Sequence, residues 1–152
     1  MLLVLFNIGS ERFGLDARDL TEILPAVPLH PVLGAPRGVA GLLLHREALV
    51  PVIDLDVLTS GEPCVTRLST RILVAHYRAG PEGARVGLRV DRANDTETVD
   101  PSEFEESGLT SAKPPYFGPV LRRGLRTIQL VNVDQLLTDE VRASLFTRNG
   151  TA

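Results

Sequence analysis

Short apolar runs separated by turn residues dominate the first half of the chain. Residues 2–8 form a β-prone run, and Gly9-Ser10-Glu11 turns the chain into a second short run over residues 12–15. This pattern predicts an opening hairpin. Two further strands are predicted over residues 38–44 and 48–53. Runs of this length are typical of a β protein built from short strands.

A helix signal follows the opening hairpin. Asp16 is a candidate N-cap residue, and the apolar residues behind it are spaced by three and four positions before Pro25. These residues are Leu20, Ile23 and Leu24. The spacing predicts a short helix that ends at the proline.

A connector and two further helical segments complete the pattern. Residues 25–37 hold four of the eleven prolines, which predicts an extended connector. Asp54 is expected to cap a helical turn that closes on Gly61. Thr138 is expected to cap a last helix over residues 139–146, with acids in its first turn.

The second half of the chain repeats the plan of the first half. Its opening hairpin is predicted over two strands, at residues 70–77 and 85–90. Within it, Val86-Gly87-Leu88 lines up with Phe13-Gly14-Leu15 at an offset of 73 residues. Near the end, residues 128–136 follow the pattern of residues 50–58 at an offset of 78 residues. Nearly equal offsets argue for two similar β units of about 75 residues.

Units of that size bury too little apolar surface to stand alone, so the two are expected to share a core. The predicted fold class is mainly β, with two small barrels packed together and short helices. The first barrel is expected over residues 1 to about 65 and the second over about 68–137, followed by a C-terminal helix over about 138–147. The whole chain, residues 1–152, then forms one domain.

Composition and charge narrow the range of functions. The chain of 152 residues has 19 acids and 16 bases, a net charge of −3, which gives no field for holding a polyanion such as nucleic acid. The longest apolar runs, residues 1–6 and 39–44, are far shorter than the roughly 18 residues of a membrane span. The first run also lacks the features of a signal peptide. We therefore expect a soluble cytoplasmic protein without direct membrane insertion.

Acidic residues concentrate in one segment. Residues 91–108 carry seven acids and one base. The segment is interpreted either as a solvated surface or as an acidic edge that orients a partner. The adjacent acids Glu105 and Glu106 are expected on the surface.

Candidate chemistry is sparse. The histidines at positions 30, 45 and 76 have no His or Cys three or four residues away, so no zinc pattern exists, and the single thiol, Cys64, cannot form an internal disulfide. No nucleophile or phosphate-loop motif is present. Asp54 could act with His45 as a base and its orienting acid, but the capping role suits its position better. No catalytic, metal-binding or cofactor-binding residue is predicted.

One stretch resembles a known family. Residues 36–47, followed by Val50-Pro51-Val52-Ile53-Asp54-Leu55, resemble the CheW-like coupling proteins of bacterial chemosensory systems. The recurrent pattern of that family is Pro-x-x-Val-x-Gly-Val-x-Asn-Leu-Arg-Gly and then Val-Pro-Val-Ile-Asp-Leu. Weaker matches extend the resemblance over nearly the whole chain, at residues 6–13, 20–24, 86–91 and 130–137.

The resemblance implies a fold and a set of partners. The family fold is two five-stranded SH3-like barrels around a shared core, and its members have no catalytic activity. Such proteins bridge the cytoplasmic tip of a methyl-accepting chemoreceptor and the regulatory domain of a CheA-type histidine kinase. The protein is then expected in the cytoplasm, recruited to membrane-associated receptor arrays.

The same resemblance suggests contact residues. Receptor contact falls on Leu20, Glu22, Gly41 and Arg46. An arginine on a rigid β turn suits this task, because its guanidinium can bind a carboxylate of a receptor helix through two hydrogen bonds. For the kinase, an exposed apolar patch with Val39 and Leu42 is expected, with core packing as the alternative for both.

The chain departs from the family pattern at one turn. Leu44-His45-Arg46-Glu47 stands where the family has Asn-Leu-Arg-Gly, so Glu47 replaces the turn glycine. If that glycine adopts a positive φ, Glu47 reshapes the loop or bears strain of about 1 kcal/mol. The departure favours a variant coupling protein of a specialised array, such as a Wsp-type surface-sensing pathway that controls a diguanylate cyclase or pili.

Two other classes of protein stay open from the sequence. One is a β-barrel module that binds a small ligand or a protein outside chemosensory signalling. The other is a small enzyme with a cleft between the barrels, which a carboxylate of unusually high pKa in that cleft would favour.

Overall fold

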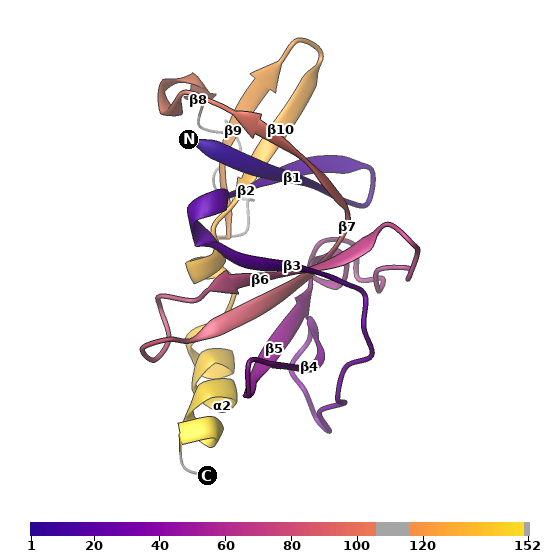
Figure 1. Cartoon of the computed structure of the whole chain (residues 1–152), viewed down its shortest axis with the longest axis vertical. Helices are drawn as coiled ribbons and strands as arrows, with labels where there is room; N and C mark the ends of the chain where they lie inside the picture. Colours follow the sequence, from indigo (N-terminus) through magenta and orange to yellow (C-terminus); the bar gives the residue numbers. More distant parts are fainter. Residues whose placement is uncertain (106–115, 151–152) are drawn as a thin grey trace.

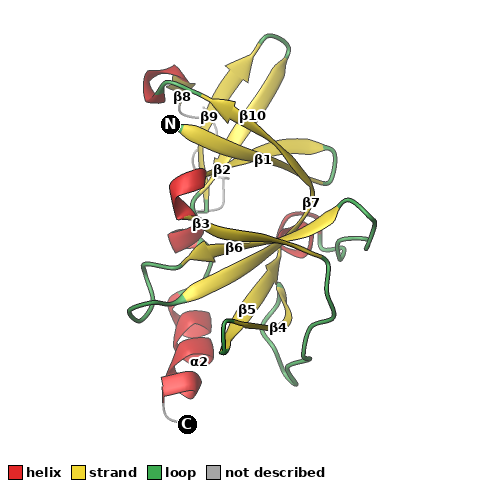
Figure 2. Cartoon of the chain, viewed as in Figure 1, coloured by secondary structure: helices red, strands yellow, loops and turns green. Residues whose placement is uncertain are grey.

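The computed structural model describes residues 1–105 and 116–150, so Glu106 lies outside the described residues. Strands dominate it, as predicted (Figure 2). The strands are β1 (Leu2–Ile8), β2 (Glu11–Asp16), β3 (Leu20–Pro25), β4 (Val39–His45), β5 (Ala48–Asp54), β6 (Thr70–His76), β7 (Arg85–Thr98), β8 (Phe104–Glu105), β9 (Phe117–Arg123) and β10 (Arg126–Val131). The helical segments are η1 (Ala17–Asp19), α1 (Leu55–Ser60), η2 (Pro101–Glu103), η3 (Val133–Gln135) and α2 (Asp139–Gly150).

The strands form two groups that share β7. Barrel A has the strand order β3-β6-β7-β5-β4, and barrel B has the order β7-β1-β2-β10-β9-β8. The first part of β7 pairs with β5 and β6, and its later part pairs with β1. In Figure 1, barrel B occupies the upper half of the molecule, barrel A the lower half, and β7 runs from one to the other. This double role explains why β7 extends to Thr98, well beyond the strand predicted at residues 85–90.

The predicted repeat is present in the strand register. The pairs His45↔Ala48 and Val39↔Ile53 of the β4–β5 hairpin recur 78 residues later as Arg123↔Arg126 and Phe117↔Val131 of the β9–β10 hairpin. The parallel contacts recur as well. Val52 of β5 lies opposite Gly87 of β7, and Leu130 of β10 lies opposite Gly14 of β2. Each of these residues is offset from its counterpart by 73 or 78 positions, as the sequence indicated.

The barrels, however, do not coincide with the predicted segments 1–65 and 68–137. Barrel B takes β1 and β2 from the first repeat and β9 and β10 from the second. Barrel A takes β3, β4 and β5 from the first repeat and β6 with the start of β7 from the second. The β2–β10 and β5–β7 pairs therefore cross residues 65–68. Each barrel is completed by strands of the other repeat.

The predicted helix after Asp16 was wrong in extent. Asp16 does cap a helical segment, since its side chain accepts a hydrogen bond from the Arg18 backbone N–H, but that segment is the single turn η1. Residues 20–25 form β3, which pairs antiparallel with β6. The apolar spacing fits either structure over so short a run, and the ladder to β6 satisfies backbone groups that an isolated helix of this length would leave unpaired.

The two barrels share one core, as the fold prediction requires. The largest hydrophobic cluster takes Phe6 and Leu15 from barrel B, Leu73 and Leu88 from barrel A, and Leu145 from α2. Each barrel also has a smaller cluster of its own. The cluster of barrel A is Leu43, Val50, Val52, Ile72 and Val74. The cluster of barrel B is Leu3, Leu5, Val99, Leu121 and Ile128.

The predicted caps and the C-terminal helix are confirmed. The Asp54 side chain caps α1, which closes on Gly61 in a left-handed conformation. The Thr138 hydroxyl accepts a hydrogen bond from the Val141 N–H at the start of α2. The Phe146 ring of α2 stacks on Tyr77, with ring centroids 5.4 Å apart. The helix thus closes the lower end of the shared core.

Candidate functional site

The β4–β5 hairpin ends in a strained two-residue turn. His45 and Ala48 pair at its base, and the two residues between them, Arg46 and Glu47, have φ angles of 50° and 66°. Positive φ at both central positions is typical of the type I′ turn, which matches the twist of a β hairpin. Glu47 therefore bears the backbone strain that the sequence anticipated at this position, and Arg46 bears it too.

His45 anchors this turn to two other strands. Its side chain is only 6% exposed, with Nε2 3.0 Å from Glu22 Oε2 on β3 and Nδ1 2.5 Å from Arg85 Nη1 on β7. A guanidinium only donates hydrogen bonds, so Nδ1 must accept and Nε2 must carry the proton that it donates to Glu22. Arg85 Nη2 also donates to the His45 backbone carbonyl, at 3.2 Å.

Glu22 and Arg46, both predicted receptor contacts, lie at the same site. Glu22 Oε1 is 3.8 Å from Arg46 Nη2, although the residues are 24 positions apart in the chain. The Arg46 side chain is 64% exposed, whereas Glu22 is about half-buried. We call Glu22, His45, Arg46 and Arg85 the Glu22 cluster. In this cluster the Arg46 guanidinium is exposed to solvent, and the buried His45 side chain holds the turn that carries it.

The other two predicted receptor residues have structural roles. Leu20 lies at the start of β3 and packs against the shared core. Gly41 is buried in β4 with φ 154°, and a Cβ there would lie 2.8 Å from the His30 carbonyl oxygen. The close approach of the two backbones requires glycine at this position.

The two predicted kinase residues differ in their surroundings. Val39 is partly buried and packs against the shared core, which is the core-packing alternative. Leu42 is also partly buried, and its backbone forms an isolated bridge with His30. Neither side chain belongs to the exposed apolar surface of the described chain.

That surface includes two leucines which the sequence reading missed. Leu44 and Leu49 lie opposite each other on β4 and β5 and are 62% and 45% exposed. The alternation of β4 explains this: Leu43 points into the barrel A cluster, so Leu44 points out. The apolar pair is adjacent to the Arg46 turn. Arg85 was also missed, since only its tertiary contact with His45 gives it a role.

Asp54 has a structural role, and Cys64 is buried. Asp54 does not meet His45; its two oxygens accept backbone hydrogen bonds from Asp56 and Cys64. Burial raises the pKa of the Cys64 thiol to about 12, which keeps it protonated and unreactive at neutral pH. Among the described residues, no group of His, Cys, Asp or Glu is placed to hold a metal ion. Nor does a helix among them have the length and apolar character to cross a membrane.

Fold and site together define a protein of two small β barrels that presents an exposed arginine at a hairpin turn. The model of the CheW-like domain family matches residues 2–141. The chain belongs to this family, and it is a coupling adaptor of a chemotaxis signalling system.

Individual relatives agree with this assignment. The chain is 27% identical to a chemotaxis protein CheW of Rhizobium meliloti over 92% of this chain and 89% of that protein. It is 21% identical to the CheW of Treponema pallidum over 91% of this chain and 82% of that protein. The crystal structure of the scaffolding protein TtCheW from Thermoanaerobacter tengcongensis superimposes with a TM-score of 0.80, at 20% identity, over 92% of this chain and 89% of the other. This last likeness supports the fold of two SH3-like barrels.

Proposed function

We propose that this protein is a non-catalytic adaptor which binds the cytoplasmic tip of a methyl-accepting chemoreceptor and the regulatory domain of a CheA-type histidine kinase. It would do so in the cytoplasm, at membrane-associated receptor arrays. Membership of the CheW-like family supports the kinds of partner. The choice of a specialised array, such as a surface-sensing pathway, rests on the altered turn at Leu44-His45-Arg46-Glu47.

The observation that carries the receptor side is the convergence of Glu22 and Arg46. Two residues named from distant motifs lie within 3.8 Å of each other. The turn that carries Arg46 is clamped by His45 and Arg85, so little backbone freedom is lost when a partner docks. The Arg46 guanidinium then exchanges its long contact with Glu22 for a planar, bidentate contact with a receptor carboxylate.

Leu44 and Leu49 extend this surface. They form an apolar strip beside Arg46, which suits the apolar face of a receptor helix next to an acidic residue. Leu20 and Gly41 act on this surface indirectly. Leu20 packs against the shared core and so holds β3, and Gly41 allows β4 to approach the segment at His30. For the kinase, Val39 and Leu42 stay the proposed contacts, and Leu42 is the one outside the core clusters.

Calorimetric titration of a receptor-tip fragment and of the kinase regulatory domain tests the proposal. Arg46→Ala is expected to weaken receptor binding by about 2 kcal/mol, roughly 30-fold, because the receptor carboxylate loses its partner in the interface. Arg46→Lys restores only part of the affinity, since an ammonium lacks the planar fork. Kinase affinity stays unchanged in both variants.

Arg122→Ala is the matched control. Arg122 is an equally exposed arginine that pairs with an exposed glutamate, Glu105, on barrel B. Its loss should leave receptor affinity as in the wild type. If Arg46→Ala binds the receptor fragment as tightly as the wild type does, Arg46 is a solvated turn residue and the receptor side of the proposal fails.

A further inference from the structure

Barrel B has a structural counterpart of the Glu22 cluster. The repeat offsets carry Glu22 to Asp95 and Arg85 to Arg12, and they carry the β4–β5 hairpin to the β9–β10 hairpin. Arg12 donates to Asp95 at 2.9 Å in this second site. The same three strand positions therefore converge at one end of each barrel, with different side chains.

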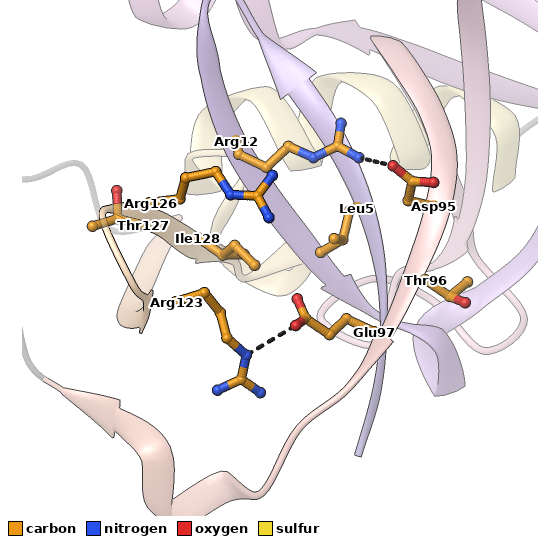
Figure 3. Close-up of a pocket in the computed structure, with 9 residues that line it drawn as sticks. All are labelled: Leu5, Arg12, Asp95, Thr96, Glu97, Arg123, Arg126, Thr127 and Ile128. Carbon is orange, nitrogen blue, oxygen red and sulfur yellow. Dashed lines mark hydrogen bonds and ion pairs between the residues drawn. The ribbon is translucent and has the colours of Figure 1, made fainter.

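The end of barrel B is hollowed. A cavity of about 270 Å³ opens there, with Leu5 and Ile128 at its apolar base. Figure 3 shows the Arg126 guanidinium pointing into this cavity, between the side chains of Arg12 and Arg123. We call this hollow the Arg126 cavity. Its lining residues are Leu5, Arg12, Asp95, Thr96, Glu97, Arg123, Arg126, Thr127 and Ile128.

The carboxylates around the Arg126 cavity are already in ion pairs. Arg123 holds both Glu97, at 2.9 Å, and Glu103, at 2.6 Å. These acids and Asp95 belong to the acidic segment that begins at residue 91, so the arginines of β2 and β9 neutralise much of its charge.

Arg126 is different. In residues 1–105 and 116–150, its side chain makes no ion pair and no hydrogen bond. Its direct neighbour across the hairpin is Arg123, which has the same charge. Among the described residues, Arg126 thus has no acidic partner, and its guanidinium keeps its full set of donors at the cavity.

An exposed apolar residue adjoins this guanidinium. The turn of the β9–β10 hairpin is Gly124-Leu125, with Gly124 at φ 62°, and the Leu125 side chain is fully exposed at the tip. A fully solvated leucine next to an arginine that no other described residue pairs is the combination of apolar and charged contacts that protein interfaces favour.

We propose that the Arg126 cavity is a docking site for an acidic protein segment. An Asp or Glu carboxylate of the partner enters the cavity and accepts two hydrogen bonds from the Arg126 guanidinium, while an apolar residue beside it covers Leu125. The site belongs to barrel B, whereas the Glu22 cluster belongs to barrel A, and it requires no role for Arg46. The adaptor then has one arginine-bearing hairpin on each barrel, and each of them binds an acidic partner.

Two blocked pentapeptides serve as probes, Gly-Leu-Glu-Leu-Gly and its glutamine analogue Gly-Leu-Gln-Leu-Gly. They are titrated into the ¹⁵N-labelled full chain while NMR follows the backbone amide signals of Leu125 and Thr127 in every variant and the Arg126 Nε–H signal wherever Arg126 is present. The glutamate peptide is expected to cause a saturable shift and to bind with about fivefold higher affinity than the glutamine peptide. Raising the salt concentration from about 50 to about 300 mM should weaken the binding of the glutamate peptide and leave that of the glutamine peptide unchanged.

Variants separate this site from the receptor surface. Arg126→Gln should remove the difference between the two peptides, and Arg126→Lys should keep only part of it, because the charge remains but the fork is lost. Leu125→Ser should weaken both peptides. Arg46→Ala should leave both affinities as in the wild type, so a failure of the receptor proposal does not touch this result.

Two outcomes overturn the proposal. One is a glutamate peptide that binds Arg126→Gln as tightly as the wild type or causes no saturable shift at Arg126. The other is sodium acetate at the same concentration producing the whole shift, which makes the cavity a small-anion site instead of a docking site.

Discussion

Replacing Glu47 by glycine should stabilise the protein. Glu47 lies at φ 66° in the Arg46-Glu47 turn, a conformation that costs a residue with a Cβ about 1–2 kcal/mol. Its side chain is exposed and makes no hydrogen bond or ion pair within the described chain, so no contact is lost with it. Against the relief of strain stands the greater backbone entropy of glycine in the unfolded state, about 0.5–1 kcal/mol.

The net gain therefore lies between about 0 and 1.5 kcal/mol, with a central value of about 0.75 kcal/mol. For a chain of this size it should raise the melting temperature by about 1–4 °C. Urea denaturation followed by circular dichroism, together with differential scanning calorimetry, measures both quantities. The slope of the free energy of unfolding against urea should not change, because the substitution exposes no new surface.

Two variants control for the loss of charge. Glu47→Ala removes the carboxylate but keeps a Cβ at the same φ, so it should give no gain. Glu47→Asn should fall between alanine and glycine, because asparagine tolerates the left-handed region better than most residues. If alanine stabilises as much as glycine, or if glycine lowers the melting temperature, the strain argument for this turn is wrong.

Three further predictions concern other parts of the fold. Asp54→Ala should lower the free energy of unfolding, measured by urea titration, by about 2–4 kcal/mol. The reason is that α1 loses its cap and the buried backbone N–H of Cys64 loses its acceptor. A loss below about 0.5 kcal/mol would contradict this prediction. Burial raises the pKa of the Cys64 thiol to about 12. At pH 8 the thiol should therefore react with a disulfide reagent at least about 100-fold more slowly in the native protein than in denaturant, and equal rates would refute its burial. Hydrogen bonds from Arg18, Ser102 and Arg123 lower the pKa values of Asp16, Asp100 and Glu103, respectively, below their unfolded values. The stability that these carboxylates contribute is present above their unfolded-state pKa values and is lost as the pH falls through their folded-state pKa values. The melting temperature should therefore decline below about pH 4.5, and a melting temperature that stays constant down to about pH 3 would contradict this.

The sequence located the strands and turns because these depend on neighbours in the chain. Short apolar runs marked β4 and β5, and Asp54 was a cap because its side chain reaches N–H groups two and three positions ahead. The repeat was visible for the same reason, since two copies of one local pattern keep their spacing. The strain at Glu47 could be anticipated from a single missing glycine.

Residues 20–25 show where local information ends. The apolar spacing there fits a helix turn and a half-buried strand about equally well over so short a run. Pairing with β6, which follows about 50 residues later, decides for the strand, because β6 supplies the backbone hydrogen bonds that β3 requires. A partner so distant in sequence leaves no mark on the segment that pairs with it.

The sequence by itself determined that this is a duplicated β protein with a family motif around Arg46. Only the tertiary structure decided that each barrel exchanges strands with the other repeat, because hydrogen bonding between β2 and β10 or between β5 and β7 depends on how the halves pack. The exchange brings Arg85 to His45 and Arg12 to Asp95. Each of these contacts joins residues at least 40 positions apart, so the charged ends of the barrels exist only once the chain has folded.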